Sequence, residues 1–116
     1  MATIKSHTDL QQSKKLAKIL PLESADMYYE WPNKKVHFKD DKYNGMGFSC
    51  WSLAALLGVL PKIDSEEPMI QKLYYANTPT ERYICQYSLT NITGEYDNPV
   101  DACVSMIEKL HELKML

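Results

Sequence analysis

The sequence predicts an α+β protein, in which a small antiparallel sheet made of two hairpins packs against three helices in the order α-β-β-α-β-β-α. Three observations predict this class: an amphipathic helical stripe near the N-terminus, a change to a period of two over residues 69–93, and a well-capped amphipathic helix near the C-terminus. With 116 residues, 45% of them hydrophobic, residues 1–116 are expected to form a single globular domain.

The first part of the chain is expected to hold one helix and one short hairpin. Thr8 can cap the helix, Gln11 three residues later completes a capping-box pattern, and Pro21 ends the helix. Aromatic residues over 25–31 favour a strand, and 36–38 resemble a short returning strand. Residues 40–47 have the composition of a loop.

The central segment 50–60 is apolar nearly all round and rich in alanine and leucine, which favours a buried helix over a strand. We expect this helix to begin near Ser49 and to stop at Pro61. Two β-rich runs around the polar turn 77–80 then predict an antiparallel hairpin. The last helix has Asn98 as its cap, followed directly by a proline at the first helical position.

Charge and cysteine usage limit the classes of function. Thirteen basic and fifteen acidic residues give a net charge of −2, which argues against a strongly basic nucleic-acid binder. Nucleic-acid binding through the lysines of the first helix stays a third hypothesis, although a solvated helix face explains these residues as well. The lysines are Lys14, Lys15 and Lys18.

The polar N-terminus, Met1 to Thr8, lacks the apolar run of a secretory signal, and the longest apolar stretch, Leu53 to Leu60, is too short for a membrane span. The three cysteines are unpaired in pattern, so we expect reduced thiols and a cytoplasmic protein without disulfides. The three histidines lack metal-binding spacing, and no cofactor motif is present, so neither a metal nor a cofactor is predicted.

One segment carries possible chemistry. Ser49, Cys50 and Trp51 resemble the nucleophile segment of papain-like cysteine proteases. A thiol at the start of a helix would have a lowered pKa, and His37 could serve as its base. The segment departs from that family at Gly47 and Phe48. A cysteine hydrolase or thiol enzyme that uses Cys50 and His37 is therefore the alternative hypothesis.

Aromatic residues are the remaining signal, because eight of the twelve are tyrosines. Neighbouring residues on a strand point to opposite faces, so each strand is expected to present tyrosines outward. Outward tyrosines are favourable contact residues at interfaces. The candidate partner-binding residues are Tyr28, Tyr74, Tyr83 and Tyr87.

Three blocks of the chain belong together in order and spacing. They are Gln12 to Leu16 with Leu20-Pro21 and Ala25 to Met27, Trp51 to Leu53 with Leu60-Pro61, and Asp101 to Cys103 with Met106, Ile107 and Leu110. These blocks resemble a group of small uncharacterised proteins encoded by prophages and mobile elements of gut bacteria. The resemblance implies an accessory protein and no particular activity. The first hypothesis is thus a non-enzymatic interaction protein that binds a protein partner or a second copy of itself.

Overall fold

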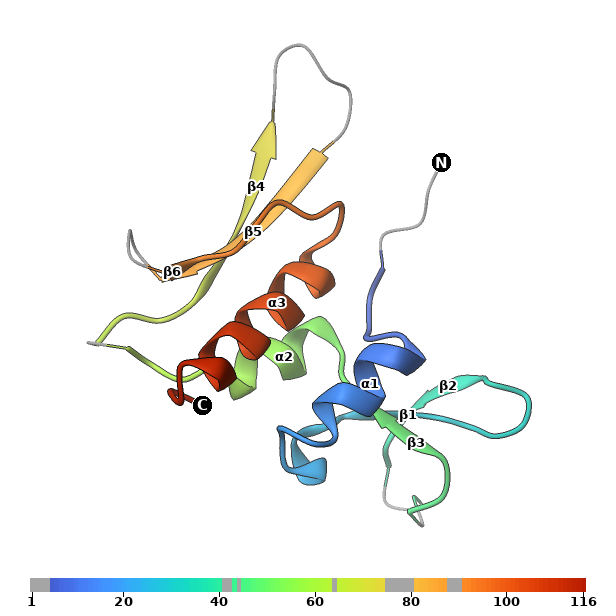
Figure 1. Ribbon diagram of the computed structural model, residues 1–116. Helices are drawn as coiled ribbons and strands as arrows, with labels where there is room; N and C mark the ends of the chain where they lie inside the picture. The colour runs from blue at the N-terminus through green and yellow to red at the C-terminus, as the bar shows by residue number, and fades with distance from the viewer. Residues whose placement is uncertain (1–4, 41–42, 44, 64, 75–80, 88–90) are drawn as a thin grey trace.

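Two separate three-stranded antiparallel sheets are joined through three helices in the part of the chain that the structure describes (Figure 1). The structure is a computed structural model that describes residues 5–40, 43, 45–63, 65–74, 81–87 and 91–116. The α+β class is confirmed, and each expected hairpin gains a third short strand. In chain order the elements are α1 (Leu10–Leu16), a 3-10 turn (Leu22–Ser24), β1 (Met27–Tyr29), β2 (Val36–Phe38), β3 (Phe48–Cys50), α2 (Leu53–Val59), β4 (Met69–Tyr74), β5 (Glu81–Tyr87), β6 (Asn91–Ile92) and α3 (Pro99–Glu112).

Helix α3 lies at the centre of the arrangement (Figure 1). One side of it packs against β5 and the other against α2, while α1 packs against β3 at the far side of the molecule. The apolar stripe of α3 supplies the largest share of the core because its residues at helical spacing are all buried. They are Val100, Ala102, Cys103, Val104, Met106, Ile107 and Leu110.

The first sheet has the order β2-β1-β3, with both outer strands antiparallel to β1. The expectation that the central helix begins near Ser49 is wrong, because residues 48–50 form β3 and α2 begins only at Leu53. Ser52 caps α2 by accepting a hydrogen bond from the amide of Ala55. The Asp26 carboxylate accepts hydrogen bonds from the backbone amide and the hydroxyl of Ser52, so a distant residue sets the start of this helix.

Helix α1 begins one residue later than expected. The capping box is formed by Asp9 and Gln12 rather than by Thr8 and Gln11. Thr8 is fully buried and instead joins α1 to β3, since its hydroxyl accepts a hydrogen bond from the Trp51 amide at 3.0 Å. Its own amide donates to the Trp51 carbonyl at 2.9 Å.

The second sheet has the order β4-β5-β6, and its register pairs Ile70 with Cys85. The alternation expected over β5 is present, because Tyr83, Cys85 and Tyr87 are all buried and β5 packs against α3. The polar turn expected over 77–80 lies outside the described residues.

The predicted start of the last helix is confirmed. Asn98 accepts a hydrogen bond from the amide of Asp101, and Pro99 is the first helical residue. Asp101 also binds the N-terminal segment. Its carboxylate accepts hydrogen bonds from the Lys5 ammonium at 2.9 Å and from the side-chain amide of Gln12 at 2.8 Å. The start of α3 and the N-terminal segment are therefore joined by charge-assisted bonds.

Replacing Asp101 by Asn is expected to lower the free energy of unfolding at pH 7 by about 1–2 kcal/mol. Burial alone raises the pKa of Asp101, but hydrogen bonds from Lys5, Gln12 and Asn98 outweigh it, so the pKa lies below its usual value. A lowered folded-state pKa stabilises the protein above the unfolded value of about 4, and this contribution is lost as the pH falls through the folded value. The difference in free energy of unfolding between Asp101→Asn and the wild type should therefore become smaller as the pH falls.

Urea unfolding of the wild type and Asp101→Asn between pH 3 and pH 7 measures this difference. Glu108→Gln is the control, because Glu108 lies on the same helix and forms no ion pair with another described residue. A deficit that is equal at pH 3 and pH 7, or one matched by Glu108→Gln, would contradict the role assigned to the carboxylate.

Candidate functional site

Cys50 and His37 do not form the expected nucleophile–base pair. On the first sheet Cys50 stands opposite Met27, whereas His37 stands opposite Tyr28, on the other side of β1. Directly opposed residues share a face of the sheet and successive residues alternate, so the side chains of Cys50 and His37 project from opposite faces. The His37 ring instead contacts the Glu30 carboxylate, with 2.7 Å between Nε2 and Oε2.

The Cys50 thiol lies in an environment that keeps it neutral. Its side chain is 0% exposed, and it belongs to β3 rather than to a helix start. Burial raises the pKa of Cys50 to about 12, with a further rise from the Asp26 charge and a smaller opposing effect of Lys39. A neutral, buried thiol is a poor nucleophile.

Iodoacetamide is accordingly expected to leave Cys50 unmodified in the native protein between pH 5 and pH 9 and to modify it once urea unfolds the chain. Per-cysteine mass spectrometry provides the measurement, and the unfolded protein at the same pH is the control. Burial raises the pKa of Cys50 in the folded protein, so the contribution of this thiol to the free energy of unfolding is complete below the unfolded pKa of about 8.5. This contribution is lost as the pH rises toward 12. Rapid native labelling of Cys50 below pH 7 would contradict the assignment.

Two of the four candidate tyrosines do not lie on an exposed face, which corrects that expectation. Tyr87 is fully buried, and its hydroxyl donates a hydrogen bond to the Pro61 carbonyl at 2.6 Å. Tyr83 is 8% exposed. Both occur at alternate positions of β5 that face α3, so periodicity identified the amphipathic strand but not which side was covered. The side chain of Tyr74 lies outside what the structure describes, whereas Tyr28 is half-buried on the first sheet.

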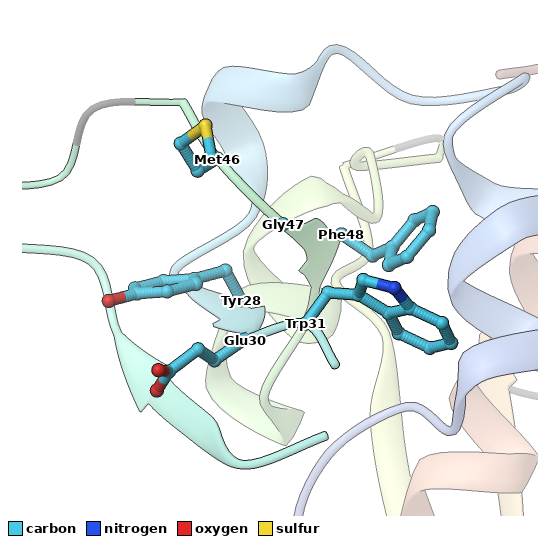
Figure 2. A pocket seen from close by; sticks show the side chains of 6 residues that line it. All are labelled: Tyr28, Glu30, Trp31, Met46, Gly47 and Phe48. Atoms are coloured by element: carbon cyan, nitrogen blue, oxygen red, sulfur yellow. The ribbon is translucent and has the colours of Figure 1, made fainter. Parts of the chain in front are cut away.

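Tyr28 lines a hollow at the end of the first sheet (Figure 2). The hollow has a volume of about 550 Å³. In Figure 2, Met46, Tyr28 and Glu30 lie on one side of the Gly47 backbone, and the rings of Trp31 and Phe48 stand together on the other side. We call this site the aromatic hollow, and its residues are Tyr28, Glu30, Trp31, Met46, Gly47 and Phe48.

Large apolar side chains of the aromatic hollow are open to solvent. Met46 is 70% exposed, Trp31 58% and Phe48 39%. The Trp31 and Phe48 rings meet edge to face at 5.9 Å, which holds them in a defined orientation. The surface is thus both apolar and preorganised, as binding surfaces tend to be.

Gly47 allows the backbone to pass close to β1. Its φ is +88°, a backbone conformation that residues with a side chain rarely adopt. A Cβ atom added at this position would overlap the carbonyl oxygen of Tyr29. Glycine at this position therefore places Met46 and Phe48 on the two sides of a sharp bend, next to Tyr28 (Figure 2).

Contacts within the first sheet position the opposite wall. The Tyr28 ring packs against those of Tyr43 and His37, with centroid distances of 4.7 and 5.5 Å. His37 in turn contacts Glu30, and the hydrogen bonds from His37 and Asn33 lower the pKa of the Glu30 carboxyl. Among the described residues that line the aromatic hollow, the single carboxylate therefore already has a hydrogen-bond partner.

Lysines stand at the edges of the aromatic hollow. The Lys14 ammonium lies 5.6 Å from the centre of the Phe48 ring, and the Lys34 ammonium lies 5.8 Å from that of the Trp31 ring. Beyond Phe48 a second hollow of about 390 Å³ opens against α1. It is lined by Ser13, Lys14, Ala17, Lys18, Phe48 and Ser49.

The sequence pattern does not distinguish Trp31, Met46 or Phe48 as binding residues. Trp31 ends a predicted strand, Met46 lies in the predicted loop and Phe48 directly follows it, and nothing in the local pattern there separates exposed from buried side chains. The available signal was two large apolar residues that flank Gly47 in an otherwise polar loop.

Comparisons with known proteins place this chain in no group, since no protein-family model, no curated protein and no solved structure matches it. Within the described ranges, no three histidine, cysteine or acidic side chains come together in a way that could hold a metal ion. None of the helices in that part of the chain has the length and apolar character needed to cross a membrane.

Proposed function

We propose that this chain is a non-enzymatic interaction protein that binds a protein partner through the aromatic hollow. The observation that carries the proposal is the exposure of Trp31, Met46 and Phe48 around one hollow. Tryptophan, phenylalanine and methionine are enriched in the centres of protein interfaces, and aromatic anchors there contribute much of the binding energy. The prophage or mobile-element origin and the cytoplasmic location belong to the same proposal, on the sequence features alone.

The alternative, a thiol enzyme, is less favoured by the geometry. The expected base, His37, lies on the opposite face of the first sheet from Cys50, and the Cys50 thiol is buried. The aromatic hollow lies at the other end of β3, where Phe48 rather than Cys50 faces it.

Photo-crosslinking tests the proposal directly. Benzoylphenylalanine in place of Met46 is expected to capture a protein partner in cells of the organism that encodes the chain, whereas the same group in place of Met115 is not. Met115 is a suitable control because it is also exposed and lies after α3, away from the first sheet.

The variants Trp31→Ala and Phe38→Ala then separate specific from nonspecific capture. Phe38 is 67% exposed but belongs to β2, the opposite edge of the sheet from β3. Loss of the crosslink with Trp31→Ala and its retention with Phe38→Ala would support the proposal. Equal crosslinking by both variants, capture of nucleic acid, or no crosslink from position 46 would overturn it.

A further inference from the structure

We propose that the partner segment that binds the aromatic hollow is an acidic, extended peptide with one large apolar side chain. This inference rests on the proposed function and names the chemistry of the partner. The apolar side chain would contact the exposed rings of Trp31 and Phe48, and acidic side chains on either side of it would meet the lysines beside these rings.

The aromatic hollow and the second hollow form one continuous surface. Phe48 lines both the aromatic hollow and the second hollow, so the two share a wall. Lys14 on α1 and Lys18, just after α1, line the second hollow. The aromatic hollow, by contrast, is mainly apolar. An extended peptide places neighbouring side chains several ångströms apart and can reach both hollows at once.

The rim of this surface is positively charged. Lys14, Lys18 and Lys34 surround the exposed rings, and none of them forms an ion pair with a carboxylate of the described residues. Glu30, the only acidic residue among the described residues that line the aromatic hollow, already contacts His37. The unbalanced charge that a partner meets here is therefore positive, and complementarity favours an acidic partner.

The arrangement of the rings favours a peptide over a single-stranded nucleic acid. A single-stranded nucleic acid also combines negative charge with affinity for aromatic rings. Stacking of bases needs open ring faces. Lys14 lies over the Phe48 ring, Lys34 lies over the Trp31 ring, and the two rings meet edge to face. This geometry leaves a hollow for a side chain rather than a flat stack for bases.

Selection of random peptides of about twelve residues on the full-length protein tests the inference. Peptides that also bind Trp31→Ala are discarded by counter-selection. We expect the remaining peptides to be enriched in aspartate and glutamate next to one leucine, phenylalanine or tryptophan. The selected peptide, labelled with fluorescein, is then titrated by anisotropy against the variants and in competition with oligothymidine.

The double variant Lys14→Glu/Lys18→Glu is expected to weaken peptide binding about ten-fold or more, and added salt should weaken binding to the wild type. Lys15→Glu is the matched control, because Lys15 lies in the same last turn of α1 but lines neither hollow. Its affinity should be close to that of the wild type.

The outcomes separate the two proposals. The acidic partner would be overturned if the Trp31-dependent peptides were neutral or basic, or if they bound Lys14→Glu/Lys18→Glu and the wild type with equal affinity. Either result would leave the binding function intact. No Trp31-dependent peptide at all would also overturn the inference, while the Met46 crosslink decides the function independently. Oligothymidine that binds more tightly than the selected peptide would overturn both.

Discussion

The Trp51→Ala protein is expected to lose about 3–5 kcal/mol of its free energy of unfolding, the largest effect of any single change considered for this chain. Trp51 is 0% exposed and is the largest fully buried side chain. Its indole N–H donates a hydrogen bond to the Ser24 hydroxyl at 2.9 Å. Truncation would leave a cavity and remove this hydrogen bond where the 3-10 turn contacts the core. A loss of this size is a large part of the total stability of a small domain.

Trp31→Ala is the matched control, because it removes the same side chain from a surface position. Its expected effect on the free energy of unfolding is below about 1 kcal/mol. Urea unfolding followed by circular dichroism measures both variants without relying on the fluorescence of the residue that is removed. Comparable losses in the two variants would contradict the assignment of one tryptophan to the core and the other to a binding surface.

The Gly47→Ala protein is expected to lose about 2–4 kcal/mol, from the left-handed backbone and from overlap with β1. A Cβ atom at this position meets the carbonyl of Tyr29, a backbone atom that cannot turn aside. The variant should therefore also weaken the pairing of β3 with β1 and displace Phe48 from the aromatic hollow.

Gly45→Ala isolates the backbone contribution. Gly45 has nearly the same φ, +86°, but nothing lies within 4 Å of an added Cβ atom. We expect it to lose only about 1–2 kcal/mol, the cost of the left-handed conformation itself. The difference between the two variants in urea unfolding measures the steric part, and equal losses would show that Gly47 does not make the close approach.

Sequence reasoning succeeded where local chemistry decides the structure. The start of α3 was predicted correctly because Asn98 and Pro99 favour a helix start whatever surrounds them. The strand positions of Tyr83 and Tyr87 followed from alternation. Which face of that strand is covered could not follow, because it depends on where α3 packs.

The boundary between β3 and α2 could not be predicted for a related reason. Apart from Ser52, residues 50–60 are almost entirely apolar, so periodicity does not separate a short strand from the helix that follows. The break at Ser52 depends on hydrogen bonds to Asp26, which is 26 residues away. The aromatic hollow likewise needs Trp31 and Phe48 to meet across two strands, and no local pattern encodes that meeting.

The bond between Lys5 and Asp101 has a consequence for the rates of folding and unfolding. It joins residues 96 positions apart, so it closes a loop that spans most of the chain. Such contacts carry the largest loop-closure entropy and are expected to form after the transition state for folding. Weakening this bond should therefore speed unfolding while leaving the refolding rate nearly unchanged. By this reasoning the N-terminal segment lengthens the lifetime of the folded state more than it helps the chain to reach it.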